Sequence, residues 1–170
     1  MKNEYYLSDY KIERIAPSQW QNYKLIRLEA LKTNPELFGS SYAKEVLYSQ
    51  DDWIALLEND ARAIFALYHL DLLIGLSGVV LNRDNQSEAI LISSFIKEAY
   101  RGRGLSQLFF QARIEWARQK ECAQVIVSHR AGNEASKAAN QRCGFVYNYS
   151  KESLWPDGLL AEELMYCLSL

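Results

Sequence analysis

Apolar residues recur at helical spacing in the first third of the chain. The first such stripe comprises Trp20, Tyr23, Ile26, Ala30 and Leu31. Spacings of three and four place these residues on one helix face, so we predict a helix from Ser18, a good N-cap, to about Lys32. Asn34 and Pro35 would end this helix, and a short strand over Tyr10–Ile15 would precede it.

A second helix is predicted after a loop at Phe38–Tyr42. Ser49 followed by Asp52 resembles a capping box, in which each of the two side chains accepts a backbone N–H at the helix start. The apolar face of this helix would comprise Trp53, Leu56 and Leu57.

Three apolar runs of strand length follow. They are Ala63–His69, Leu72–Leu81 and Ala89–Ile96. A turn near Asp71 and the polar cluster Asn82–Ser87 connect them, and such short connections favour an antiparallel meander.

The clearest helical pattern comes directly after Gly102 and Gly104. Its apolar residues, spaced i, i+3, i+4, i+7 and i+11, are Leu105, Leu108, Phe109, Ala112 and Trp116. Four more elements are predicted downstream. They are a strand over Ala123–His129, a helix over Asn133–Cys143 ended by Gly144, and strands over Phe145–Tyr149 and Glu163–Ser169.

These elements follow one another in the order β-α-α-β-β-β-α-β-α-β-β. A strand, a crossover helix and another strand indicate a parallel pair at the centre of the sheet. We therefore predict an α/β (α+β) fold with a mixed, mostly antiparallel six- or seven-stranded sheet and four helices. No repeat, linker or low-complexity segment divides the 170 residues, so one domain over residues 1–170 is expected.

Composition narrows the classes of function. A net charge of −2 gives no general basic field for nucleic acid. No apolar stretch approaches the ~20 residues of a membrane span, and the N-terminus lacks the apolar core of a secretory signal, so a cytoplasmic location is expected. The spacing of Cys122, Cys143 and Cys167 matches no zinc or redox pattern, so we expect buried reduced thiols and no metal site.

The segment Tyr100–Ser106 carries the strongest chemical signal, because it lies between a predicted strand and an amphipathic helix. A helix start offers unpaired N–H groups and the positive end of the dipole, and glycines let a phosphate approach the backbone closely. Arg101 and Arg103 add positive charge. There is no Gly-Lys-Ser/Thr ending of a Walker loop, and Gln107 replaces the third glycine of a dinucleotide fingerprint. The alternative is a plain strand-to-helix turn with its arginines in solvent.

Three segments resemble the GNAT superfamily of N-acetyltransferases. Ile96–Ser106 is similar to its motif A, a strand followed by Arg/Gln-x-x-Gly-x-Gly/Ala, in which Arg101 and Gly104 match and Ser106 takes the last position. Asn133–Phe145 resembles the family's Asn-x-x-Ala/Ser…Gly-Phe segment. The stretches Arg27–Leu31 and Asn34–Tyr42, followed by Glu45, look like a branch often found in bacteria, with a Pro-Glu-Leu-Phe-Gly-Ser-Ser-Tyr segment.

This resemblance implies a sheet that splays between its fourth and fifth strands, with acetyl-CoA as co-substrate in the notch. The backbone of Phe95, Ile96 and Lys97 would pair with the pantetheine amides like an added strand. The N–H groups that would bind the pyrophosphate are those of Arg101, Gly102, Arg103, Gly104, Leu105 and Ser106. Asn133 and Ser136 would contact the cofactor from the other side, and Asn133 is also suited to be a helix N-cap.

The resemblance also indicates a departure at the leaving group. Many family members protonate the departing thiolate with a tyrosine, and this chain has Asn140 at the matching position. An amide cannot act as an acid, so the thiolate leaves unassisted, or water or another residue replaces the tyrosine. Asn140 would instead bind pantetheine. The N–H of Ile96 is the expected donor to the oxyanion.

Acetylation needs a neutral amine, and a lysine-like amine has a pKa of ~10.4, so a base or a water chain must take a proton. The competing side chains are Glu88 in the fourth strand, Glu45 behind the 38–42 loop, His129 ending the fifth strand, and Asp84 in a turn. Each also has a purely structural interpretation, as a strand-end charge, a salt-bridge partner, a structural histidine or a turn residue. Aromatic residues that would line the acceptor pocket, or else pack in the core, are Tyr42, Trp53 and Trp155.

Together these features predict an enzyme that moves an acetyl group from acetyl-CoA to a primary amine of a small molecule or a peptide. Attack would be direct, in a ternary complex, because no cysteine stands beside a clear histidine partner. Two other hypotheses stay open: an acyl-CoA-binding module that senses without turnover, which Asn140 supports, and nucleotide or RNA binding through Arg101 and Arg103. No nucleic-acid or membrane partner is expected, and a homodimer is an open option because dimers are common in the family.

Overall fold

A mixed eight-stranded sheet organises the part of the chain that the computed structural model describes, residues 5–7 and 9–170. The strands lie in the order β1-β2-β3-β4-β5-β6-β8-β7. Their bounds are β1 Tyr5–Leu7, β2 Tyr10–Arg14, β3 Arg62–His69, β4 Leu72–Leu81, β5 Glu88–Ile96, β6 Gln124–Arg130, β7 Val146–Leu154 and β8 Leu160–Ser169. Every neighbouring pair is antiparallel except β5 and β6, which are parallel, as predicted.

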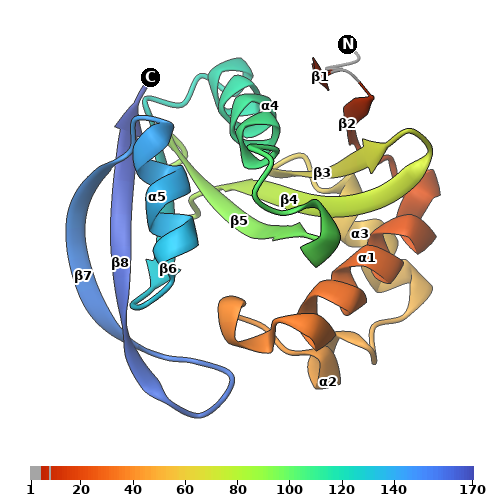
Figure 1. The fold of residues 1–170 in the computed structure, drawn as a ribbon, viewed down its shortest axis with the longest axis horizontal. Coiled ribbons are helices and arrows are strands. Elements are labelled where there is room, and N and C mark those ends of the chain that lie inside the picture. Colours follow the sequence, from red (N-terminus) through yellow and green to blue (C-terminus); the bar gives the residue numbers. More distant parts are fainter. Residues whose placement is uncertain (1–4, 8) are drawn as a thin grey trace.

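Helices cover both faces of the sheet (Figure 1). The described residues form α1 Trp20–Thr33, α2 Tyr42–Glu45, α3 Gln50–Glu58, α4 Ser106–Gln119 and α5 Glu134–Arg142. Helices α1 and α3 pack on one face, whereas α4 and α5 pack on the other. None of the helices in the described ranges is long and apolar enough to cross a membrane.

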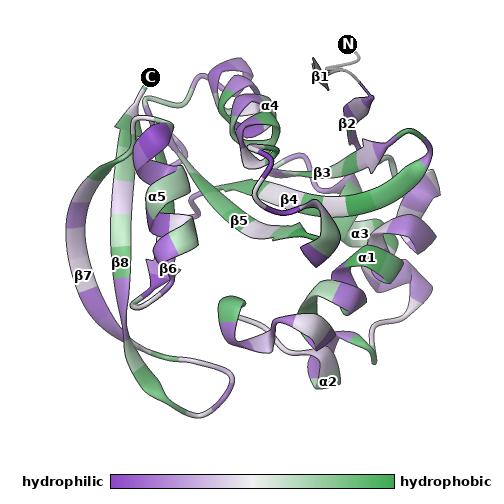
Figure 2. Cartoon of the chain, viewed as in Figure 1, coloured by the Kyte–Doolittle hydropathy of each residue, from purple (hydrophilic) through white to green (hydrophobic). Residues whose placement is uncertain are grey.

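The two faces of the sheet bury separate apolar clusters. Successive residues of β3 point to opposite faces, so Ile64 joins the cluster under α1 and α3 while Phe65 joins the cluster under α4. A strand that is buried on both faces reads as a continuous apolar run, and Figure 2 shows this apolar colour along much of β4. The predicted meander over β3, β4 and β5 is therefore confirmed.

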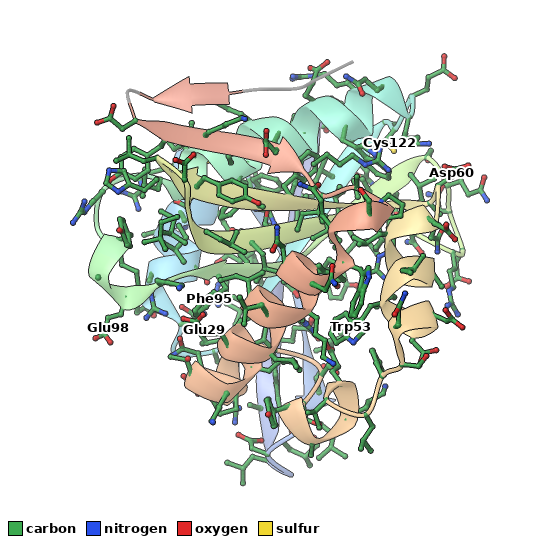
Figure 3. All side chains as sticks on the ribbon, turned by 90° about the vertical axis from the view of Figure 1, so that its right-hand side faces the viewer. Glu29, Trp53, Asp60, Phe95, Glu98 and Cys122 are labelled. Atoms are coloured by element: carbon green, nitrogen blue, oxygen red, sulfur yellow. The ribbon has the colours of Figure 1, made fainter. Side chains whose placement is uncertain are left out.

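Local capping fixes the start of α3. The Ser49 side chain accepts the N–H of Asp52 at 3.1 Å, and the Asp52 carboxylate accepts the N–H of Ser49 at 2.8 Å. Trp53 then enters the core, where it is 0% exposed and packs edge-on against Tyr23 of α1 at 5.2 Å (Figure 3). Of its two predicted roles, Trp53 thus has the core role.

The parallel pair is short, and this opens the sheet. Strands β5 and β6 pair only from Glu88 to Ile90, opposite 124–126. Beyond Ile90, β5 continues to Ile96 without β6 beside it, and the two halves of the molecule diverge (Figure 1). The predicted splay between the fourth and fifth strands is confirmed. These two strands are β5 and β6 in the structure, because the short edge strand β1 shifts the numbering by one.

Three features differ from the predicted elements. Helix α2 begins at the last residue of the expected 38–42 loop and continues where no element was predicted, because the Ser41 side chain caps its start. Ser18 does not cap α1, which follows a 3-10 turn at Pro17–Gln19. Strands β7 and β8 form a longer hairpin than predicted, because its outer part is largely exposed and carries no apolar alternation.

Candidate active site

A cavity of about 800 Å³ occupies the splay between the two halves of the sheet. One wall comes from the open part of β5 and the start of α4, and the other from β6 and α5. The segment from α1 to α2 closes a third side. Predicted site residues that line this cavity are Glu45, Phe95, Ile96, Arg101, Gly102, Gly104, Leu105, Ser106, His129, Asn133, Ser136 and Asn140.

Consecutive main-chain amides at the start of α4 lack partners. Among the described residues, no hydrogen bond is formed by the N–H groups of Gly102 through Ser106, whereas the N–H of Arg101 is bonded to the carbonyl of Glu98. The N-cap residue Leu105 supplies no capping side chain either. Unpaired amides at a helix start attract an anion, so this segment is built as an anion site.

The glycines make the segment possible. Gly102 and Gly104 both have φ of +74°, a conformation that side chains with a Cβ disfavour. No atom lies within 4 Å of a Cβ built at either position, so the space in front of both is open. Alternating right- and left-handed residues turn successive N–H groups to one side and form a concave nest.

The two arginines hold the segment in place. Arg101 donates to the carbonyl of Ile96 and to Oδ1 of Asn34, both at 2.7 Å. Arg103 donates to the Tyr10 hydroxyl at 3.0 Å and the Ala99 carbonyl at 3.1 Å. Both side chains are exposed but tied by these hydrogen bonds, and Arg103 does not line the cavity. Their charge acts on the nest from its edges.

Only part of the predicted β5 edge is available to a ligand. The N–H of Lys97 donates to the carbonyl of Ile74, and the Lys97 ammonium pairs with Glu29 at 3.4 Å. Hydrogen-bonded and non-bonded pairs alternate in an antiparallel ladder, so Phe95 also faces β4. The expectation that Phe95 and Lys97 offer their backbone to pantetheine is therefore corrected. Of the three residues, Ile96 alone turns its N–H toward the splay, and its carbonyl already accepts from Arg101.

Two residues of α5 face the nest from across the cavity. Asn133 accepts the N–H of Ser136 at 3.1 Å, so the predicted N-cap is confirmed. Asn140 is 3% exposed, and its Nδ2 has no hydrogen-bond partner in the described part of the chain. A buried amide without a partner is costly, by roughly 1–3 kcal/mol, and its position in the cavity wall indicates a place for a ligand acceptor.

Glu45 is committed to an ion pair. Its carboxylate accepts Nε and Nη2 of Arg27 at 2.8 and 2.7 Å, and Nη1 of Arg27 donates to the Ser93 hydroxyl at 3.1 Å. Burial would raise the pKa of Glu45, but the hydrogen bonds and charge of Arg27 outweigh it and hold the pKa below its usual range. A carboxylate so held is a weak base, so the salt-bridge interpretation fits Glu45 better than the base.

Two of the other candidates lie outside the cavity. Glu88 accepts hydrogen bonds from Asn82 at 2.8 Å and from Gln124, at the closed end of the β5–β6 pair. Asp84 donates its N–H to Oδ1 of Asn82 at 3.1 Å, which is the pattern of a turn residue. The structure thus corrects both as bases, because neither carboxylate reaches the splay.

His129 lines the cavity but its ring nitrogens are occupied. Nδ1 lies 2.9 Å from the carbonyl of Arg130, which can only accept, so Nδ1 carries the proton. Nε2 lies 3.3 Å from the Tyr166 hydroxyl. The ring is buried against Tyr166 with both nitrogens hydrogen-bonded, which is the structural arrangement rather than that of a free base.

Sequence reasoning missed one carboxylate in the cavity wall. Glu163 of β8 accepts the hydroxyls of Ser128 at 2.6 Å and Ser153 at 2.8 Å. Burial would raise its pKa, but these hydroxyl bonds and the ammonium of Lys151, which pairs with the carboxylate at 3.6 Å, together outweigh it and keep the pKa low. The available signal in the sequence was Glu163 itself, a charged residue at the start of the last predicted strand. Trp155 also lines the cavity, under the Arg130–Asp157 ion pair at 2.7 Å, whereas Tyr42 does not.

Comparison with known proteins relates this arrangement to a family. Residues 19–145 match the sequence profile of the acetyltransferase (GNAT) family. A search of curated protein sequences finds no match to the chain. The profile spans both the nest at the start of α4 and the α5 wall of the cavity.

Solved structures share the fold at low sequence identity. A GNAT-family acetyltransferase from Streptococcus pneumoniae superposes with a TM-score of 0.78 at 17% identity, covering 95% of this chain and 99% of its own. A ribosomal-protein-S5-alanine acetyltransferase from Vibrio fischeri gives 0.81 at 12%, covering 98% and 96%. YncA from Salmonella typhimurium, solved with its cofactor acetyl-CoA, gives 0.79 at 14%, covering 96% and 95%. At such identities the likeness extends to the fold.

Proposed function

The chain belongs to the acetyltransferase (GNAT) family and is an acyltransferase, and we propose that it transfers the acetyl group of acetyl-CoA to a primary amine of a small molecule or peptide. The observation that carries the proposal is the run of unpaired amides from Gly102 to Ser106, which opens into the same cavity as the unpaired edge of β5. An anion site beside a free strand edge suits a molecule with a diphosphate and an amide-bearing arm.

The residues present fit coenzyme A in three places. The nest at Gly102–Ser106 binds the pyrophosphate, and the open space before its glycines admits phosphate oxygens. Ile96 turns its N–H toward the splay, and the orphan Nδ2 of Asn140 donates to the arm from α5. Bound acetyl-CoA supplies an activated thioester carbonyl. The N–H of Ile96 is placed to stabilise negative charge on that oxygen.

The acceptor amine enters from the side opposite the nest. Glu163 and Trp155 line that side, and an ionised carboxylate beside an aromatic ring suits a cationic amine. Glu45, Glu163 and His129 are all held by other side chains. We therefore assign removal of the amine proton to water in the cavity. Attack is direct, because none of the described cavity residues is a cysteine.

Calorimetry with a Gly104→Glu variant tests the cofactor site. A carboxylate at the centre of the nest repels phosphate, so acetyl-CoA binding should be lost. Gly158→Glu is the matched control, since Gly158 has φ of +80° and open space around it but lies in the β7–β8 loop outside the cavity. Unchanged affinity in Gly104→Glu would remove the assignment.

Release of free thiol from acetyl-CoA on a panel of amines tests turnover. Thiol release that depends on the amine, with the matching acetylated product in the mass spectrum, is the expected result. Tight acetyl-CoA binding without release on any peptide or small amine would replace the proposal with the acyl-CoA-binding module. Binding that instead follows RNA with a steep salt dependence would assign the nest to nucleic-acid phosphate.

A further inference from the structure

Arg113 of α4 is a buried cation without a carboxylate. It is 1% exposed, and its acceptors are neutral. Nε donates to the Phe109 carbonyl at 3.2 Å, while Nη1 donates to the Ser94 hydroxyl at 2.9 Å and approaches the Gly78 carbonyl at 3.5 Å. No hydrogen bond from Nη2 is found in the described ranges. A buried guanidinium held only by neutral groups retains most of its charge for a further partner.

Two other arginines in the cavity wall are neutralised, whereas the half-buried Arg62 has no ion pair in the described part of the chain. Arg27 is paired with Glu45, and Arg130 with Asp157. Arg113 instead lies over the ring of Phe110 at 5.0 Å, which compensates a charge only weakly. Desolvation lowers the pKa of Arg113 to about 9, so the group is still protonated near neutral pH. The fully buried charge of Arg113 is therefore not compensated by a carboxylate in the described part of the chain.

Arg113 lies beside the part of the cavity along β5 that is away from the Gly102–Ser106 nest. Arg113 lies seven residues after Ser106, about 10 Å along α4 from the nest at a rise of 1.5 Å per residue. Its partner Ser94 belongs to the bulge in β5, where the register shifts beyond the last pair with β6. Asn140 lines the same cavity from α5. The nest and the guanidinium thus mark two ends of one path along β5.

We propose that Arg113 stabilises the negative charge on the CoA sulfur as the acetyl group leaves, in place of the acid that Asn140 cannot provide. This inference rests on the proposed function. The amine nitrogen forms the new bond to the acetyl carbon, the carbon–sulfur bond breaks, and its electron pair stays on sulfur. The proton that the amine loses goes to water, and one proton from water later balances the thiolate. A nearby cation lowers the barrier by favouring the thiolate form.

A thiol already present shows the sign of this effect. Burial raises the pKa of Cys143 at the end of α5, and the charge of Arg113 opposes that rise. Of the titratable groups facing Arg113, Cys143 is the one from α5, while β4 and β5 present a carbonyl and a hydroxyl. The cavity carboxylates Glu45 and Glu163 are held by other groups, and both ring nitrogens of His129 in β6 are hydrogen-bonded.

The thiol pKa of bound CoA tests the proposal without turnover. Ultraviolet absorbance of the thiolate is followed from about pH 6 to about pH 10 with saturating protein, since a free thiol has a pKa of ~8.5. We expect the bound thiol to titrate at least about one unit lower in the wild type, near ~8.5 in Arg113→Met, and low again in Arg113→Lys. Arg118→Met, an exposed arginine on the same helix, is the matched control.

Desulfo-CoA separates this inference from the proposed function. Calorimetry should give equal desulfo-CoA affinity for the wild type and Arg113→Met, because the thiol is the group that Arg113 addresses. A wild-type thiol pKa at or above ~8.5 would overturn the inference without any variant. So would an unshifted pKa in Arg113→Met, an equal loss of desulfo-CoA binding, or tighter binding of succinyl-CoA than acetyl-CoA, which would assign the guanidinium to an acyl carboxylate. Failure of the wild type to bind either ligand would refute the proposed function as well.

Discussion

Replacing Glu45 with glutamine should destabilise the protein strongly, although the side chain keeps its shape. The carboxylate and Arg27 share two short hydrogen bonds, and their side chains are only 7% and 8% exposed. Glutamine keeps one acceptor oxygen but leaves the guanidinium charge without a counterion. The same guanidinium holds Ser93 in the β5 bulge, so the acceptor side of the cavity would loosen with it.

The magnitude follows from the burial of the pair. Removing one partner of a buried ion pair costs about 3–5 kcal/mol, and the acceptor that remains places Glu45→Gln near the lower end, about 3 kcal/mol. For a chain of this length each 1 kcal/mol lowers the melting temperature by roughly 2–4 °C, so we expect a fall of roughly 6–12 °C. Replacing both partners, as Arg27→Met with Glu45→Leu, should cost less than Glu45→Gln, because no charge stays unpaired.

Urea unfolding at neutral pH and at acid pH provides the assay. Because the pKa of Glu45 is lowered by folding, its contribution is present above the unfolded pKa of ~4.3 and is lost as the pH falls through the folded value. The difference in the free energy of unfolding between the wild type and Glu45→Gln should therefore disappear in acid. Glu58→Gln, which alters an exposed carboxylate of α3 with no hydrogen bond or ion pair in the described part of the chain, should stay within about 0.5 kcal/mol of wild type. A loss under about 1 kcal/mol for Glu45→Gln would refute the reasoning.

Three further substitutions probe the cavity. Gly104→Ala and Gly158→Ala should each lower the free energy of unfolding by about 1–2 kcal/mol, because both positions have positive φ. Only Gly104→Ala should weaken acetyl-CoA binding in calorimetry. Asn140→Ala should weaken CoA binding by roughly 3–10-fold, the value of one hydrogen bond, and leave the pH profile of turnover unchanged. The control Asn148→Ala, on exposed β7, should change neither the CoA affinity nor the pH profile. A lost limb in that profile would instead make Asn140 part of the proton path. Glu163→Gln should raise KM for a cationic amine about tenfold with CoA affinity unchanged, in steady-state kinetics. Equal KM in both proteins would exclude Glu163 from amine binding.

Features held by neighbours in sequence could be predicted from the sequence. The capping box of Ser49 and Asp52 is formed by residues three apart, and the nest at Gly102–Ser106 needs only two glycines and a following helix. The apolar stripe of α4 and the succession of helices and strands along the chain are equally local in origin. Such patterns depend on φ, helical period and capping, which are properties of short segments.

The roles of the charged residues depended on partners far away along the chain. Glu45 was an open candidate base until the fold placed it against Arg27, 18 residues earlier, and Arg27 against Ser93, 66 residues later. The outer β7–β8 hairpin was also underestimated, because an exposed strand pair is held by its register rather than by apolar alternation.

Arg113 is the clearest case of information that resides in the fold. In sequence it is one polar residue beside the apolar stripe of a surface helix, where an arginine is ordinarily solvated. Its burial without a carboxylate appears only when β4 and β5 supply Gly78 and Ser94, 35 and 19 residues away. Local rules set which segments become helices, strands and nests, whereas desolvation and the choice of counterion depend on register and packing between distant segments.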